Sequence, residues 1–115
     1  MLRGEIFLAP FPYTDLVRTK RRPVCVISAD GYNAGVDVVV AMITSQNARL
    51  TRPGIGDFVV VEWQQAGLLA PSALRAGRIW STEKRLLGAR LGQLTTSDSK
   101  RLDTAIASVL GLDAR

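Results

Sequence analysis

The chain has 115 residues, a formal net charge of +5 at pH 7 and a sequence pI of about 10.1. This length predicts one domain, residues 1–115, and a hydrophobic content of 47% argues against intrinsic disorder. No apolar run approaches the roughly 20 residues that cross a bilayer, and Glu5 and Pro10 interrupt any secretory leader, so we expect a cytoplasmic protein with no membrane association.

The residue types that are missing narrow the chemistry. The sequence contains no histidine and one cysteine, and its acidic residues show none of the spacings of known metal-binding motifs. We therefore expect neither a metal site nor a cofactor. Cys25 lies in an apolar β-branched run, which predicts that it is buried and packs as a small hydrophobic side chain.

The basic charge comes mostly from arginine, which supplies twelve of the fifteen cationic residues. The planar guanidinium matches phosphate with two parallel hydrogen bonds, so this composition indicates a polyanionic partner. RNA, DNA and an acidic protein all remain open at this point, as does a charge that serves only solubility.

The first half of the chain predicts three strands. Residues 5–11 alternate weakly and end at prolines, which is typical of an edge strand. After a polar stretch, the β-branched runs 24–27 and 37–44 predict two more strands, the second buried on both faces. Glycine, asparagine and proline predict loops at residues 29–35 and 49–56.

Two further strands are expected at residues 57–63 and 72–81, with Gly67 between them. In the second strand, alternation places Arg75 and Gly77 on one face and Leu74, Arg78 and Trp80 on the other.

The end of the chain changes to helical periodicity. Apolar residues recur at the spacing of an amphipathic helix, with an N-cap region at residues 95–98 and Gly111 as the stop. Five short strands followed by one helix predict a mainly β (α+β) fold, a small curled sheet or partly open barrel.

The segment 18–23 is the densest basic stretch and includes Arg18, Lys20, Arg21 and Arg22, close to Tyr13. An exposed loop of this kind can hold phosphates while the aromatic ring stacks on a base, although a solvated hairpin fits equally well. Arg22 precedes a proline, which favours an extended backbone and so presets the direction of a possible oxyanion clamp.

Thr44 and Ser45 close the apolar strand 37–44, and Gln46 opens the following loop. A hydroxyl at a strand end can donate to a phosphate oxygen, but it more often satisfies local backbone groups. The pattern alone favours the local role.

Five short motifs recur in the same order in MazF/PemK toxins: Arg3-Gly4-Glu5-Ile6, Arg22-Pro23-Val24, Asn33, Ile43-Thr44-Ser45 and Leu91-Gly92-Gln93-Leu94. The chain therefore resembles this family along nearly its whole length. The resemblance implies an SH3-like, partly open β-barrel with a C-terminal α-helix that forms a homodimer. It also implies a sequence-specific, metal-independent endoribonuclease that cleaves single-stranded RNA and binds a separately encoded antitoxin protein.

The resemblance also assigns roles to residues. The family's catalytic arginine maps onto Arg22 and its catalytic threonine onto Thr44. Arg75 matches the arginine of an Arg-x-Asp motif, but Gly77 stands where the acid would be, and a histidine that some members carry in the first loop is missing. We expect Arg22, Thr44 and Arg75 to be catalytic, and we expect the substrate-binding residues to be Tyr13, Arg18, Lys20, Arg21, Ser45, Gln46 and Arg78.

In metal-free RNA cleavage the 2′-OH attacks its own phosphodiester, leaving a 2′,3′-cyclic phosphate and a 5′-hydroxyl. Arg22 and Thr44 suit charge stabilisation best, because both donate hydrogen bonds to developing charge and a guanidinium is a poor base at neutral pH. Arg75, Asp15 or water could transfer the protons.

Two alternatives to an endoribonuclease remain, and neither of them cleaves RNA. A non-catalytic, gyrase-poisoning toxin on the same scaffold would act on a protein, although residues 111–115 lack the aromatic tail of such poisons. A plain RNA-binding module would release RNA at high salt and leave it intact.

Overall fold

The computed structural model describes residues 1–10 and 21–112. Six strands form one antiparallel sheet in the order β4-β5-β3-β2-β1-β6. The strands are β1 (Glu5–Pro10), β2 (Arg21–Val26), β3 (Asp37–Thr44), β4 (Asp57–Val59), β5 (Ala73–Glu83) and β6 (Arg90–Gln93). The helices are α1 (Asp30–Asn33), α2 (Asn47–Thr51), the 3-10 turn η1 (Lys84–Leu86) and α3 (Thr96–Leu110).

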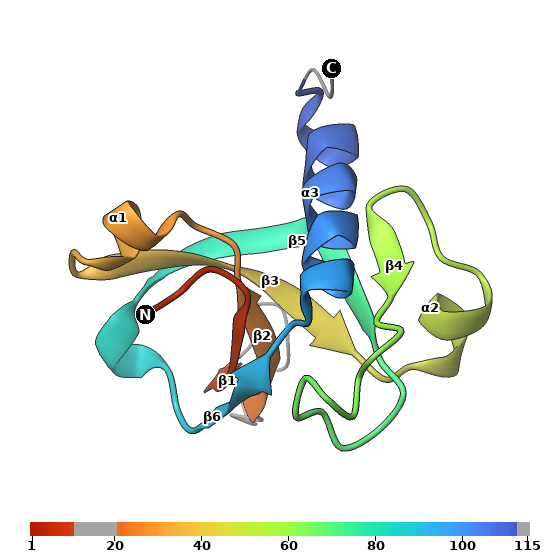
Figure 1. Ribbon diagram of the computed structural model, residues 1–115, viewed down its shortest axis with the longest axis horizontal. Coiled ribbons are helices and arrows are strands. Elements are labelled where there is room, and N and C mark those ends of the chain that lie inside the picture. The colour runs from red at the N-terminus through yellow and green to blue at the C-terminus, as the bar shows by residue number, and fades with distance from the viewer. Residues whose placement is uncertain (11–20, 113–115) are drawn as a thin grey trace.

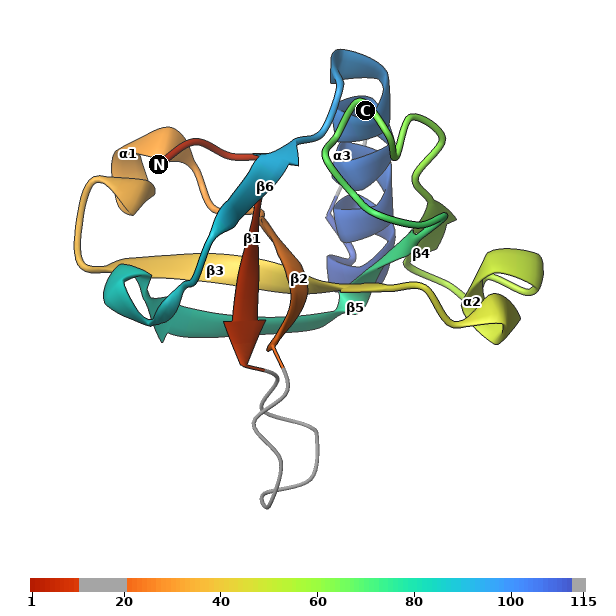
Figure 2. The ribbon, with the colours of Figure 1, turned by 90° about the horizontal axis from the view of Figure 1, so that it is seen from below.

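The sheet is strongly curled, and α3 stands beside its β4–β5 side (Figures 1 and 2). The larger apolar cluster lies on the helix side of the sheet and includes Cys25, Ala41, Ile43 and Leu74 together with Leu102 of α3. A second cluster fills the other side, with members Ala9, Val24, Val26, Val38 and Val40. Strand β3 contributes to both clusters, which confirms the prediction that residues 37–44 are buried on both faces.

The loop that follows the edge strand β4 makes a backbone contact with the other edge strand, β6. Residues 60–72, which we call the cavity loop, connect β4 to β5 and reach across to β6. A Cβ at Gly67 would lie 2.1 Å from the Leu91 carbonyl oxygen, and one at Gly92 would lie 2.1 Å from the Ala66 carbonyl oxygen. Only glycines allow this approach, and it turns the curled sheet into a partly open barrel.

Local signals place α3 accurately. The Thr95 side chain accepts a hydrogen bond from the Asp98 N–H, and Gly111 adopts a left-handed conformation with φ of 69° at the C-cap. The predicted cap region and stop are therefore confirmed. Within the described ranges, no helix has the length and apolar character needed to cross a membrane.

Cys25 is fully buried in the cluster beneath α3. Burial raises the pKa of its thiol to about 12, so the side chain stays protonated at neutral pH. The prediction that Cys25 is a buried, small apolar side chain is confirmed.

The strand predicted over residues 57–63 is wrong beyond Val59. The Val60 N–H donates to the Ser72 carbonyl, and the next two N–H groups, those of Val61 and Glu62, donate to the Asp98 carboxylate instead of to a strand. The Asp98 carboxylate of α3 thus ends β4, and the chain turns from residue 61 onward. The strand β6 was not predicted, and the predicted loops 29–35 and 49–56 contain α1 and part of α2.

The predicted faces of β5 are also wrong in part. Ala41 pairs with Ile79 but its neighbour Met42 pairs with Arg75, so residues 76–78 form a bulge. Three inserted residues invert the alternation. Leu74 consequently packs beneath α3, whereas Trp80 packs against the second cluster on the other face.

Candidate active site

A cavity of about 330 Å³ opens where β2 begins, β3 ends and the cavity loop crosses. Its polar lining consists of Arg22, Thr44, Ser45 and Ser72. Its remaining lining is apolar: Leu8, Pro23, Ile43, Leu68, Leu69, Ala70 and Leu91. The cavity therefore brings together two of the three residues expected to be catalytic, Arg22 and Thr44, although 22 positions separate them.

Sheet register explains how Arg22 reaches the cavity. Arg22 lies within β2, opposite Ala9 of β1, in the extended conformation predicted for a residue before proline. Strand β2 pairs with β3 as Val24 with Met42, and continuing this register by two residues brings Arg22 level with Thr44. The Nε atom of Arg22 is buried, so the inner part of its guanidinium is held within the protein.

Thr44 is the last residue of β3 and is only 4% exposed. Its Oγ1 atom accepts a hydrogen bond from the Gln46 N–H at 3.2 Å, which is the local backbone role that the pattern favoured. That contact uses a lone pair of the hydroxyl oxygen and leaves the hydroxyl proton to donate. Ser45 is exposed and follows at the cavity mouth.

The sequence motifs do not predict Ser72 or the aliphatic wall of the cavity loop, formed by Leu68, Leu69 and Ala70, as parts of the site. Ser72 is buried, and its hydroxyl donates to the Ala70 carbonyl at 2.8 Å. None of these residues belongs to a recognisable motif, and their position depends on how the cavity loop crosses to β6. No local signal in the sequence could have found them.

Comparison with known proteins now identifies the family. Residues 2–110 match the family described as PemK-like, MazF-like toxin of type II toxin-antitoxin system. The chain belongs to the PemK/MazF toxin family. It is similar to Endoribonuclease MazF6 of Mycobacterium tuberculosis and to Endoribonuclease MazF2 of Mycobacterium bovis. Each is 33% identical over 113 residues, and the match covers 96% of this chain and 96% of the relative.

Solved PemK/MazF structures share the fold. An endoribonuclease in complex with its cognate antitoxin, from a Mycobacterial species, superposes with a TM-score of 0.81 at 23% identity, covering 100% of this chain and 99% of the other. The MazE-MazF structure from Deinococcus radiodurans gives a TM-score of 0.73 at 19% identity, with 98% of both chains covered. The predicted mainly β fold, a small partly open barrel with a C-terminal helix, is confirmed.

In this PemK/MazF chain, Arg75 does not join the cavity that contains Arg22 and Thr44. Its Nε atom donates to the Asp57 carboxylate at 3.2 Å, and the Asp57 side chain is only 4% exposed. Arg49 lies 4.0 Å from the same carboxylate. Arg75 thus has an acidic partner on the neighbouring strand β4. The family's Arg-x-Asp motif would instead place the acid at position 77, two residues after Arg75 on β5.

The other predicted substrate-binding residues either do not line the cavity or lie beyond the described ranges. Arg21 is exposed one residue before Arg22, Gln46 is exposed before α2, and Arg78 is exposed on the β5 bulge. None of these three is among the described residues that line the cavity. Tyr13, Arg18 and Lys20, together with Asp15, lie outside the described residues.

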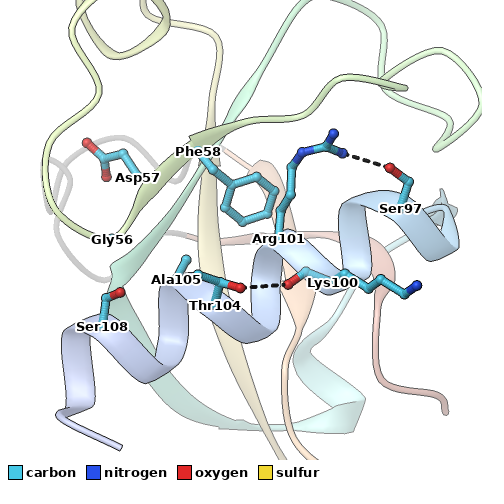
Figure 3. Close-up of a pocket in the computed structure, with 9 residues that line it drawn as sticks. All are labelled: Gly56, Asp57, Phe58, Ser97, Lys100, Arg101, Thr104, Ala105 and Ser108. Atoms are coloured by element: carbon cyan, nitrogen blue, oxygen red, sulfur yellow. Dashed lines mark hydrogen bonds between the residues drawn. The ribbon is translucent and has the colours of Figure 1, made fainter. Parts of the chain in front are cut away.

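A second depression, of about 620 Å³, lies between β4 and α3 (Figure 3). Lys100 and Arg101 line it together with Phe58, and three of its polar side chains, those of Ser97, Arg101 and Thr104, make hydrogen bonds within α3. Arg101 donates to Ser97 at 2.9 Å and Thr104 to the Lys100 carbonyl at 3.3 Å. This larger depression holds none of the residues predicted to be catalytic, so the chemistry points to the smaller cavity.

Proposed function

We propose that this chain is the endoribonuclease toxin of a type II toxin-antitoxin system, acting in the cytoplasm on single-stranded RNA. One observation carries the proposal: Arg22 and Thr44 come from adjacent strands and line one cavity. Relatives that match nearly the whole chain are named endoribonucleases, which supports the same reaction.

In the proposed reaction, the 2′-OH of the substrate attacks the adjacent phosphorus and the bond to the 5′-oxygen of the next nucleotide breaks. Arg22 donates to the nonbridging phosphate oxygens, and the Thr44 hydroxyl donates to the same developing charge. A preorganised donor of this kind contributes about 10²- to 10³-fold in rate. A guanidinium is a poor proton acceptor, so Arg22 stabilises charge and does not act as the base.

We assign the proton transfers to water. Apart from Arg22, the described residues that line the cavity carry no charged side chain. Arg75 is held by Asp57 at a different place on the sheet, which argues against the acid or base role considered from the sequence. DNA lacks the 2′-OH and is not a substrate under this mechanism.

The mechanism also predicts independence from metal ions, because Arg22 supplies the positive charge at phosphorus. The test is incubation of the purified protein with a long single-stranded RNA in excess EDTA, followed by mapping of the new ends. We expect cuts at one recurring short sequence, with 5′-hydroxyl and 2′,3′-cyclic phosphate ends.

Each alternative gives a different result in that experiment. Product ends carrying 5′-phosphate, or a strict requirement for added magnesium, contradict the mechanism. RNA that is bound but intact favours a plain RNA-binding module, and RNA that is neither bound nor cut favours a non-catalytic toxin that acts on a protein.

We propose two protein partners: a second copy of this chain and a separately encoded antitoxin. A structural neighbour is described as an endoribonuclease in complex with its cognate antitoxin, which supports the second. The described sheet ends at two short edge strands, β4 and β6, which a second copy could cover. Sedimentation at micromolar concentration should give the mass of a dimer, and a strict monomer argues against that pairing.

A further inference from the structure

The cavity loop presents an aliphatic wall beside Arg22 and Thr44. Leu68 is buried against the core, Leu69 is 94% exposed, and both line the cavity together with Ala70. A single exposed leucine is common on protein surfaces. Leu69 differs from an ordinary surface leucine because its side chain continues the lining of the candidate active site, and because its loop is fixed at two places.

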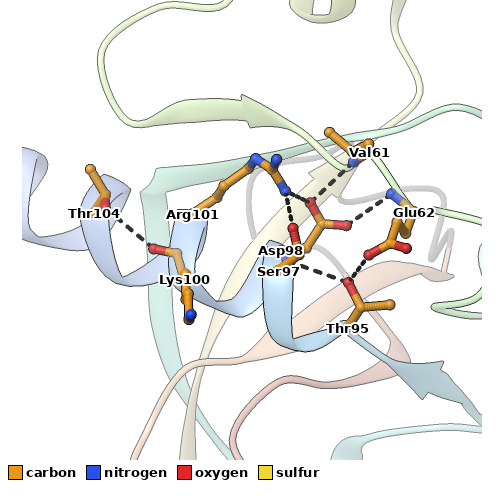
Figure 4. Close-up of polar contacts among 8 residues, drawn as sticks. All are labelled: Val61, Glu62, Thr95, Ser97, Asp98, Lys100, Arg101 and Thr104. Carbon is orange, nitrogen blue, oxygen red and sulfur yellow. Dashed lines mark hydrogen bonds and ion pairs between the residues drawn. The ribbon is translucent and has the colours of Figure 1, made fainter.

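The first fixed point is the contact between the loop's beginning and α3 (Figure 4). The fully buried Asp98 carboxylate accepts hydrogen bonds from the N–H groups of Val61 at 3.1 Å and Glu62 at 2.9 Å. Arg101 pairs with the same carboxylate at 3.0 Å, and the Thr95 hydroxyl donates to the Glu62 carboxylate at 2.6 Å. These contacts fix the position of residues 61 and 62, at the start of the cavity loop, relative to α3.

The second fixed point lies two residues before Leu69. Gly67 packs its backbone directly against Leu91 of β6, so closely that no side chain fits between them. The Leu68 N–H also donates to the Trp63 carbonyl at 3.0 Å, which closes a turn within the loop. The backbone that leads to Leu69 is thus fixed before any ligand arrives, so binding there requires little ordering of the loop.

We propose that Leu69 is a substrate-positioning residue: with Leu68 and Ala70 it forms the seat for the nucleobase next to the scissile phosphate. This inference rests on the proposed function, because the phosphate must lie at Arg22 and Thr44. A phosphodiester carries its base a short distance away, and the aliphatic wall is the adjoining part of the same cavity.

Size and charge both favour a base at this wall. The cavity volume of about 330 Å³ is at the lower end of the roughly 300–1,000 Å³ of small-ligand sites, so it suits one nucleotide unit. Among the described lining residues, the wall offers no cation for a second phosphate. Every nucleobase has an apolar face that packs on such a surface without reading hydrogen bonds. Leu69 therefore positions the base by apolar contact.

The test is a double-mutant cycle between the protein and the RNA. The substrates are a short RNA with one mapped cut site and two forms that lack the base 5′ or 3′ of the cut but keep the ribose. The proteins are the wild type, Leu69→Ala and the control Ile55→Ala, which truncates an aliphatic side chain of similar exposure, 89%, that does not line the cavity.

On intact RNA, Leu69→Ala should lower kcat/KM about tenfold, the loss expected for removing apolar contact in a binding pocket. One abasic RNA should be cut more slowly by the wild type, and on that RNA Leu69→Ala should cause no further loss. Ile55→Ala should match the wild type on all three substrates. Thermal melts should show that both variants keep the fold, because both side chains are exposed.

Full activity of Leu69→Ala on intact RNA overturns the inference, and so do losses that multiply on both abasic RNAs. A wild-type protein that cuts RNA but shows no coupling to Leu69 contradicts only this inference. A wild-type protein that cuts no RNA contradicts the proposed function as well.

Discussion

Replacing Asp98 by alanine should destabilise the fold strongly, because this carboxylate joins α3 to the cavity loop. Its side chain is fully buried and accepts hydrogen bonds from two backbone N–H groups and from Arg101. Hydrogen bonds to a charged group contribute about 1.5–3 kcal/mol each, and the two backbone N–H groups lose theirs, whereas Arg101 is 43% exposed and adds little. We therefore expect a loss of about 3–5 kcal/mol in the free energy of unfolding.

The matched control is Asp103→Ala on the same helix. Asp103 also pairs with an arginine, Arg3, at 2.6 Å, but its side chain is 62% exposed, so its loss should cost at most about 1 kcal/mol. For a domain of this size, about 1 kcal/mol shifts Tm by roughly 4 °C. Asp98→Ala should therefore melt on the order of 12–20 °C below the wild type, measured by circular dichroism with urea unfolding alongside. Equal effects of the two substitutions would refute the role given to Asp98.

Three further results are expected. Thr44→Val keeps the shape and removes the hydroxyl, so RNA cleavage should fall by about 10²-fold while Tm stays within a few degrees; near-wild-type cleavage would return Thr44 to a purely local role. Gly92→Ala places a Cβ 2.1 Å from a backbone carbonyl oxygen, so the variant should show a lower urea midpoint than Gly88→Ala, whose Cβ would meet a flexible arginine side chain at 2.5 Å. Burial disfavours the charged form of Glu5, but a backbone N–H and the Arg90 guanidinium outweigh it and lower its pKa. Its stabilisation should be present above the ordinary pKa near ~4.3 and be lost as pH falls through the lowered value, so Glu5→Gln should lose stability at pH 7 but little at pH 2.

The elements that the sequence predicts well are those set by local pattern. The apolar run 37–44 forms β3 with the predicted bounds, and α3 begins and ends at the predicted capping residues. The end of β4 was not predictable, because Asp98 lies far along the chain and its carboxylate takes the N–H groups that would have extended the strand. The bulge in β5 likewise inverts a pattern that alternation alone would continue.

The candidate site shows the same division. Arg22 and Thr44 could be chosen from ordered motifs, and the sheet places them at one cavity. Leu69 and Ser72 carry no motif, since their position depends on the contact between the cavity loop and β6. Arg75 matches a family motif in sequence, but its guanidinium is taken by Asp57 on the neighbouring strand.

The central claim is that Arg22 stabilises charge during RNA cleavage. It is tested most directly by single-turnover cleavage rates, measured with saturating concentrations of the Arg22→Ala protein and of its control, Arg21→Ala. Arg21 lies one residue earlier on β2, is exposed and is not among the lining residues of the cavity. We predict that Arg22→Ala cleaves at least about 10²-fold more slowly, equivalent to roughly 2.7 kcal/mol of transition-state stabilisation, while Arg21→Ala affects mainly RNA binding. A single-turnover rate for Arg22→Ala equal to that of the wild type would contradict the account.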